Sequence, residues 1–220
     1  MLFTDRHEAG RQLAARLLAL KLKNPVVLAL PRGGVPVGCE IARALAAPLD
    51  LVLVRKIGAP DQEELAVGAI ADGEQPELVT DPRLIDLLHV SPAYLEHTKS
   101  AALQEIERRR RVYLGDRRPV EVAGRTAIVV DDGVATGATM LAALRATRRR
   151  APARLVLAVP VAPRDALKRL RGEVDEVVCL GTPAQFFAVG QFYRAFPQLR
   201  DDEVTALLDQ AQAFVPSDHG

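Results

Sequence analysis

Several residue types are scarce in this chain, and each scarcity excludes a class of protein. Its 220 residues include no tryptophan and only two cysteines. Cys39 and Cys179 lie in apolar stretches, so we expect reduced core thiols rather than a disulfide framework. With 29 basic and 28 acidic residues the net charge is +1, which gives no overall attraction to nucleic acid or to a membrane surface. No apolar run is long enough to cross a bilayer, so a cytoplasmic protein is predicted.

Hydrophobic residues, in contrast, make up 49% of the chain, enough for one well-filled domain over residues 1–220. Short apolar runs alternate with stretches of helical spacing, which predicts an α/β fold whose central sheet is mostly parallel and flanked by helices. Asp5 and Glu8 predict the start of a first helix that ends near Lys23. The central strands are expected at residues 25–30, 50–57 and 126–130, at "RLVLAVPVA" and at "EVVCLGTP".

Two segments interrupt this alternation. Between residues 73 and 119 we expect an insertion that carries the longest polar helix, "SPAYLEHTKSAALQEIERRRRVYL", and "LAVGAIADG" with "PELVT" predicts an exposed hairpin beside it. Residues 181–200 gather most of the few aromatic side chains, including Phe186 and Phe187, after the last strand. Core packing explains some of these rings, and a small C-terminal hood that stacks on a ligand explains why they cluster.

The segment "IVVDDGVATGAT" joins three kinds of chemistry in twelve positions. Its apolar run predicts a buried strand, so Asp131 and Asp132 fall at the strand's carboxyl end, the edge where α/β sheets bind ligands. The loop of small residues and threonines that follows, residues 135–139, leads into a helix whose first amides favour an anion. Two carboxylates repel a second phosphate but accept hydrogen bonds from a diol, so the ligand inferred from the residues is a ribose 5-phosphate unit.

Simpler explanations exist for each part of this segment. Paired aspartates before a turn are often a solvated strand end or a helix cap. A nucleotide-binding P-loop is excluded because the turn contains no lysine, and the dinucleotide fingerprint is absent.

Cationic residues follow two other predicted strands. Arg32, Gly33 and Gly34 come after the first strand, where two glycines expose backbone amides and an arginine can bind phosphate oxygens in pairs. Arg55 and Lys56 come at the end of the next strand. Alone, these residues also fit a tight turn and a pair of surface cations. Three anion-suited features at three strand ends instead favour a diphosphate-bearing ligand.

The segment "IVVDDGVATGAT" closely resembles the signature of the type I phosphoribosyltransferases. The segments "RKIGAP…AVGAI" and "FFAVGQFYRAF" resemble a poorly characterised bacterial branch of that family, with similarity over most of the chain. The resemblance implies that Asp131 and Asp132 hold the ribose hydroxyls, and that the 5′-phosphate is bound by Ala135, Thr136, Gly137, Ala138 and Thr139. Arg32, Gly33 and Gly34 would bind diphosphate, with Lys56 as the preferred further contact and Arg55 as the second choice. Mg²⁺ would arrive with 5-phosphoribosyl 1-diphosphate, without a dedicated protein cage.

The resemblance also implies an activity: diphosphate leaves the anomeric carbon while an acceptor nitrogen attacks it, with Asp131, Asp132, Arg32 and Lys56 as the catalytic set. The hood, with Phe186 and Phe187, would hold a small-molecule acceptor. In relatives that use 6-oxopurines an aspartate precedes the T-G pair, whereas this chain has Ala135, which indicates a different acceptor. A regulatory protein that binds the same ligand without turnover is the alternative, and a homodimer is compatible with the sequence.

Overall fold

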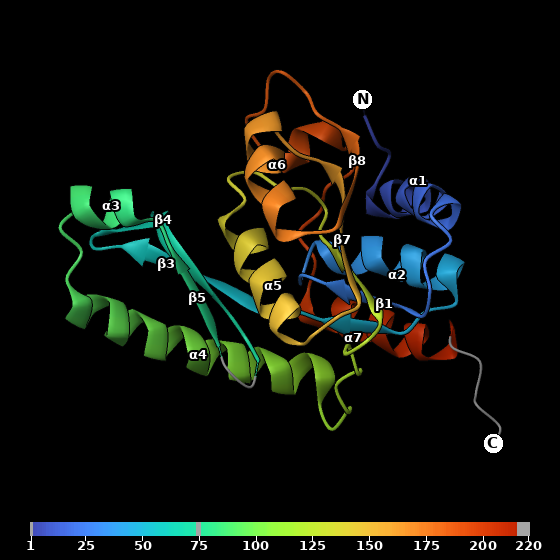
Figure 1. Ribbon diagram of the computed structural model, residues 1–220, viewed down its shortest axis with the longest axis horizontal. Helices are drawn as coiled ribbons and strands as arrows, with labels where there is room; N and C mark the ends of the chain where they lie inside the picture. Colours follow the sequence, from blue (N-terminus) through green and yellow to red (C-terminus); the bar gives the residue numbers. More distant parts are fainter. Residues whose placement is uncertain (1, 74–75, 215–220) are drawn as a thin grey trace.

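The computed structural model describes residues 2–73 and 76–214, which form two sheets surrounded by helices (Figure 1). The expected domain of residues 1–220 thus extends beyond the described residues at both ends, and the expected insertion includes two residues, 74 and 75, outside them. The main elements are α1 (Arg6–Ala19), β1 (Pro25–Ala29), α2 (Gly34–Leu45), β2 (Leu49–Leu51), β3 (Val54–Ala59), β4 (Gln62–Ala71), β5 (Glu77–Thr80), α3 (Pro82–Leu87), α4 (Pro92–Leu114), β6 (Thr126–Val130), α5 (Ala138–Arg149), β7 (Arg154–Val161), α6 (Arg164–Leu170), β8 (Glu176–Gly181) and α7 (Asp201–Ala211).

The central sheet has five parallel strands in the order β2-β1-β6-β7-β8, which confirms the predicted α/β class. From β1 the chain winds through α2 to β2 on one side. From β6 it winds through α5 to β7 and then through α6 to β8 on the other side. The winding direction therefore reverses between β1 and β6. In open α/β sheets this switch point, at the carboxyl ends of the strands, is where ligands bind.

Alternating side chains of the strands fill two cores, one on each face of the sheet. Val27 and Ile128 point to the face covered by α1 and α2. Leu28 and Val129 point to the opposite face, which α5 and α6 cover. Because both faces are buried, the strands consist of continuous apolar runs, and this is why the sequence predicted them well.

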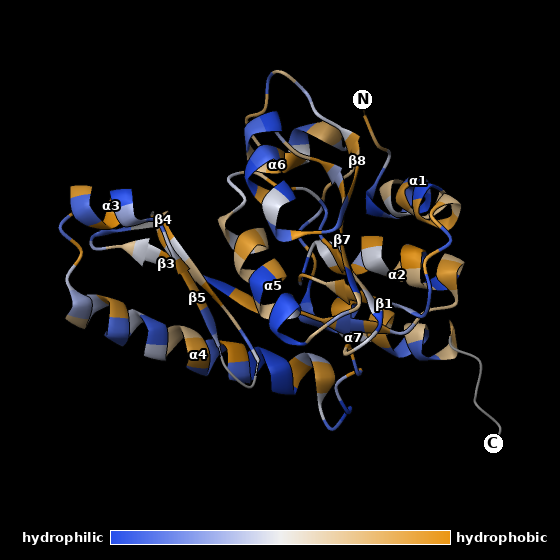
Figure 2. Ribbon diagram, viewed as in Figure 1, coloured by the Kyte–Doolittle hydropathy of each residue, from blue (hydrophilic) through white to orange (hydrophobic). Residues whose placement is uncertain are grey.

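A second sheet, β3-β4-β5, is antiparallel and extends away from the central sheet, with α4 running along it (Figure 1). Ile57 and Ile70 pack toward α4, while Ala69 packs toward α5. The predicted hairpin and long helix are confirmed, but the hairpin is not exposed, since helices cover both of its faces. Figure 2 shows hydrophilic and hydrophobic residues alternating along α4, as expected of a helix with one buried side.

The prediction of one strand over residues 50–57 is wrong, because this stretch forms two strands in different sheets. Between β2 and β3 the chain passes from one sheet to the other at Val52 and Leu53, where the Leu53 N–H donates to Asp72 Oδ1 (3.1 Å) and the Asp72 N–H donates to the Leu53 carbonyl (2.9 Å). No glycine or proline marks this change of sheet, so the apolar run gave no sign of it. Arg55 and Lys56 consequently lie within β3 and not at the end of a central strand.

The first helix begins as predicted, with Asp5 Oδ1 accepting from the Glu8 N–H at 2.8 Å. It ends at Ala19, earlier than the predicted end near Lys23, because Lys21 and Asn24 adopt positive φ angles of 48° and 45°. Within residues 2–73 and 76–214, none of the helices has the length and apolar composition needed to span a membrane.

Candidate functional site

Asp131 and Asp132 directly follow β6, at the carboxyl edge of the central sheet. The Asp131 Oδ1 atom accepts a hydrogen bond from the Asp132 N–H at 2.8 Å. Burial, and then the neighbouring charge of Asp132, raise the pKa of Asp131 well above its usual range. Burial also raises the pKa of Asp132, against the opposing effect of Arg6. Asp131, which accepts only the Asp132 N–H among the described contacts, is therefore short of hydrogen-bond donors, which a ligand with vicinal hydroxyls would supply.

The two glycines after β1 lie directly against the acidic pair. A Cβ atom on Gly33 would sit 2.0 Å from Asp132 Oδ2, and one on Gly34 would sit 2.7 Å from the Val130 carbonyl oxygen. Gly33 thus leaves room for the Asp132 carboxylate and Gly34 lets the two backbones approach, a reason different from the amide exposure that the sequence suggested. The structure thus brings the loop after β1 and the loop after β6 together at the switch point.

The loop of residues 135–139 begins the helix α5. Ala135 and Thr136 are exposed, and Gly137 is the N-cap with φ +85°, a conformation that favours glycine. No side chain caps this helix end, so its first amides face the loop without a capping group among the described residues. Arg169 of α6 donates to the Thr136 carbonyl. Sequence reasoning missed Arg169, since nothing in its position along the chain links it to the loop.

Arg32 lies on the same edge as the acids and remains partly accessible. Its side chain is 35% exposed, and its Nη1 atom is 3.9 Å from Asp201 Oδ1 at the start of α7. Asp201 also accepts a hydrogen bond from the Tyr113 hydroxyl at 2.6 Å. At 3.9 Å the contact with Asp201 is a loose ion pair, so an incoming anion could compete for the guanidinium.

The two cations of β3 point to opposite faces of the second sheet. The Arg55 Nη1 atom lies 3.9 Å from Glu105 Oε1 of α4. Lys56 is exposed, and strand alternation places it on the same face as Val54, which packs toward α5. Lys56 is therefore on the side of the sheet that faces α5, the helix that follows the loop of residues 135–139, whereas Arg55 is directed to α4.

The two predicted hood phenylalanines differ in environment. Phe186 packs on Phe192 with ring centroids 5.1 Å apart, inside a small hydrophobic cluster. Phe187 is 87% exposed. The Gln191 side chain accepts from the N–H groups of Phe187 (3.0 Å) and Ala188 (3.2 Å), which fixes the loop that carries this ring. Phe187 is therefore the one of the two with ring surface to offer a ligand.

Arg6 is a further residue of this site that sequence reasoning did not find. It is the first residue of α1, and its Nε atom donates to Asp132 Oδ2 at 2.7 Å. A cation is disfavoured at a helix N-terminus, which is the one local sign that Arg6 has an unusual partner. That partner lies 126 positions away, so only the fold could identify it.

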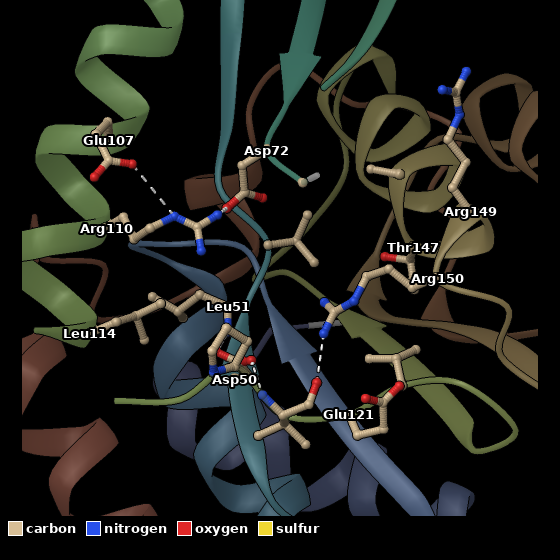
Figure 3. Close-up of a pocket in the computed structure, with 16 residues that line it drawn as sticks. Asp50, Leu51, Asp72, Glu107, Arg110, Leu114, Glu121, Thr147, Arg149 and Arg150 are labelled. Atoms are coloured by element: carbon tan, nitrogen blue, oxygen red, sulfur yellow. Dashed lines mark hydrogen bonds and ion pairs between the residues drawn. The ribbon is translucent and has the colours of Figure 1, made fainter. Parts of the chain in front are cut away.

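A cavity of ≈ 930 Å³ lies elsewhere, between α4, the end of α5 and the edge of β2 (Figure 3). Its walls carry charges of both signs, among them Asp50, Asp72, Arg110 and Arg150. None of the loop residues predicted to bind ligand lines it. The cavity is therefore distinct from the candidate site.

Asp72, on the wall of this cavity, gives a prediction for the pH dependence of stability. Burial raises its pKa to about 6 despite Arg110 and Arg150, with Asp50 adding to the rise. Since the unfolded pKa is about 3.9, ionisation of Asp72 lowers stability as the pH rises from about 4 to 6, by roughly 2 to 3 kcal/mol. Relative to Asp72→Asn, the wild type should therefore lose this amount of unfolding free energy between pH 4 and pH 7. Denaturant titrations at several pH values measure the difference.

Asp116→Asn is the matched control for that measurement, because Asp116 is an exposed carboxylate just beyond α4. Measured over the same pH range, it gives the effect of removing an exposed carboxylate, with which the Asp72→Asn series is compared. A difference between Asp72→Asn and the wild type that does not change with pH would contradict the raised pKa of Asp72.

Comparison with known proteins adds to this geometry. A sequence profile of the phosphoribosyl transferase domain matches residues 4–194. This chain belongs to the phosphoribosyl transferase family. Two Mycobacterium tuberculosis proteins, from strains CDC 1551 and H37Rv and both named for a proposed phosphoribosyl transferase activity, are 50% identical over 210 residues, which is 96% of this chain and 47% of theirs. The chain thus spans about half the length of these relatives.

The solved structure of TT1426 from Thermus thermophilus resembles this chain over nearly the full length of both proteins. It is 43% identical with a TM-score of 0.78, and the match covers 96% of this chain and 99% of that one. The predicted family and its type I fold are therefore confirmed.

Proposed function

We propose that this chain binds 5-phosphoribosyl 1-diphosphate with Mg²⁺ and transfers the phosphoribosyl group to a nitrogen of a small acceptor, releasing diphosphate. One observation carries the proposal. The acidic pair (Asp131 and Asp132), the glycine loop after β1 (Gly33 and Gly34) and the uncapped N-terminus of α5 meet at the switch point of the sheet. Diol, diphosphate and monophosphate are the three groups that these features suit, and a phosphoribosyl diphosphate contains all three.

In this proposal each part of the site has one task. The Asp131 carboxylate accepts from the ribose hydroxyls, and the amides at Ala138 and Thr139 bind the 5′-phosphate. Arg32 and the backbone at Gly33 and Gly34 receive the diphosphate. The bond from the anomeric carbon to diphosphate breaks, a bond to the acceptor nitrogen forms, and that nitrogen loses a proton. Catalysis then consists of positioning and of stabilising the leaving charge.

Mg²⁺ would offset the charge of the diphosphate during this transfer. No group of three His, Cys, Asp or Glu side chains suited to a metal ion occurs in the described part of the chain. The ion would be held through ligand oxygens and water, which is how Mg²⁺ often binds beside phosphates. The chain's own contribution would be Arg32 and, from β3, Lys56.

The acceptor would lie under the hood, where Phe187 presents an exposed ring on a loop fixed by Gln191. Flat, nitrogen-containing rings stack on such a side chain, so a heterocyclic base is the acceptor class that this feature favours.

A direct test incubates the protein with phosphoribosyl diphosphate, Mg²⁺ and a panel of bases and small amines, and follows diphosphate release. We expect Mg²⁺-dependent release with at least one acceptor. Calorimetry on the same sample separates the other outcomes. Binding without any release would support the alternative of a non-catalytic regulatory protein, whereas no binding would refute the proposal.

Within that panel, we predict at least tenfold lower kcat/KM for hypoxanthine and guanine than for the best acceptor. The reason is Ala135, which has no ionisable group where 6-oxopurine relatives carry an aspartate that exchanges a proton with the base. Adenine and orotate, assayed side by side, are the reference acceptors. Turnover of hypoxanthine or guanine at about 10⁴ M⁻¹s⁻¹ or above would contradict the prediction.

A further inference from the structure

The Arg6 side chain is buried against the second acid of the motif and has three partners. Its side chain is 9% exposed, and its Nε donates to Asp132 Oδ2 at 2.7 Å. Its Nη1 donates to the Pro197 carbonyl at 2.9 Å, and its guanidinium carbon lies 3.7 Å from the centroid of the Phe196 ring. One arginine thus joins α1, the loop after β6 and the segment that follows the hood's short helical turn.

The same hood segment also holds the backbone of Asp132. The Tyr193 hydroxyl donates to the Asp132 carbonyl at 2.6 Å, and the Tyr193 ring packs on Phe196, with centroids 5.0 Å apart. Residues of the N-terminus pair with this segment, since the Phe3 N–H donates to the Phe192 carbonyl (2.7 Å) and the Arg194 N–H donates to the Phe3 carbonyl (2.8 Å). Both the side chain and the main chain of Asp132 are therefore fixed by residues outside the motif.

On its remaining side the Asp132 carboxylate meets the glycine loop, where a Cβ at Gly33 would be 2.0 Å from Oδ2. Its side chain is only 12% exposed. The carboxylate is thus confined between Arg6 and Gly33, while its neighbour Asp131 is half-buried and accepts only the Asp132 N–H among the contacts of the described residues. The two acids have different surroundings although they are adjacent in sequence.

We propose that Arg6 is a positioning residue for ribose binding: it fixes the Asp132 carboxylate against the glycine loop and leaves Asp131 as the principal acceptor for the ribose hydroxyls. This inference rests on the proposed function. A buried carboxylate without its cation would either move or become neutral, and in both cases the Asp131–Asp132 dipeptide, unlike the more distant residues 135–139, would lose the position that presents Asp131. Lysine keeps the charge but has neither the forked donors nor the flat face that contacts Phe196.

The test compares Arg6→Gln and Arg6→Lys with Arg16→Gln, an exposed arginine on the same helix that serves as the control. Calorimetry measures two ligands on each folded variant, ribose 5-phosphate and inorganic phosphate. Inorganic phosphate has no diol for the acidic pair, so its binding would report on the anion-binding loops, residues 135–139 and the loop after β1, and not on Asp131. We expect Arg6→Gln to weaken ribose 5-phosphate binding about tenfold with phosphate binding within twofold of wild type, Arg6→Lys to fall between, and Arg16→Gln to bind as wild type.

A double-mutant cycle on stability, with Arg6→Gln, Asp132→Asn and the combined variant, tests the ion pair without any ligand. We expect the two changes to be coupled by at least tenfold in the unfolding equilibrium, because each single change leaves a buried partner unpaired. If Arg6→Gln does not fold, the binding comparison uses Arg6→Lys and Asp132→Asn instead. We expect both variants to weaken ribose 5-phosphate binding more than phosphate binding.

The outcomes separate this inference from the proposed function. The positioning role alone would be overturned if the wild type binds ribose 5-phosphate and Arg6→Gln binds it equally well. It would also be overturned if Arg6→Gln loses ribose 5-phosphate binding in parallel with phosphate binding. A wild type that binds neither phosphoribosyl diphosphate nor ribose 5-phosphate would overturn the proposed function and the role of Arg6 within it. In that case, coupling between Arg6→Gln and Asp132→Asn in the double-mutant cycle would show that the Arg6–Asp132 ion pair serves only stability.

Discussion

Gly33→Ala should lower the free energy of unfolding by about 4 kcal/mol and reduce phosphoribosyl diphosphate binding below detection in the protein that remains folded. Gly33 has φ −60°, an angle that alanine adopts freely, so the effect does not come from backbone strain. It comes from the 2.0 Å between the new Cβ and Asp132 Oδ2. To relieve this overlap the carboxylate must move from Arg6 or the glycine loop must move from the sheet, and either shift disrupts the site.

Gly172→Ala is the matched control, because a Cβ at Gly172 meets no atom within 4 Å. Urea titrations of both variants, with calorimetry on phosphoribosyl diphosphate, give the two quantities. The control should stay within about 0.5 kcal/mol of the wild type and should bind normally. Near-wild-type stability and binding in Gly33→Ala would show that the two loops are not packed as the structure places them.

Asp131→Asn should move binding and stability in opposite directions. Binding of phosphoribosyl diphosphate should weaken by roughly 3 to 4 kcal/mol, several hundredfold, because charge-assisted hydrogen bonds from two hydroxyls are lost. Stability at pH 7 to 8 should rise instead. The folded pKa of Asp131 is raised above its unfolded value, so ionisation destabilises the fold as the pH increases from the unfolded toward the folded pKa, and asparagine removes this cost.

Calorimetry and thermal unfolding on the same preparations measure both effects, and Asp116→Asn again provides an exposed carboxylate as control. The increase in stability over wild type should shrink as the pH is lowered, since Asp131 in the wild type then becomes protonated. Unchanged affinity in Asp131→Asn would remove the diol assignment, and a loss of stability would contradict the raised pKa.

The central sheet and the segment "IVVDDGVATGAT" were predictable because the properties that produce them lie in neighbouring residues of the chain. Buried parallel strands require continuous apolar runs, and the stretch Thr126–Val130 is such a run. The acids after it are costly to bury, which placed them at the strand's end, and the small residues that follow predicted a loop that leads into a helix. The sequence by itself therefore determined the fold class, the long helix α4, and which loops carry the candidate site.

Tertiary structure alone decided how these pieces meet. The apolar run at residues 50–57 continues through Val52 and Leu53, and only the pairing of β3 with β4 shows that the chain changes sheets there. Distance along the chain likewise hid two contacts of the Asp132 carboxylate, the ion pair with Arg6 and the close approach of Gly33. Hydrophobic pattern and backbone preference act between neighbours along the chain, whereas a buried charge selects its partner by distance in space.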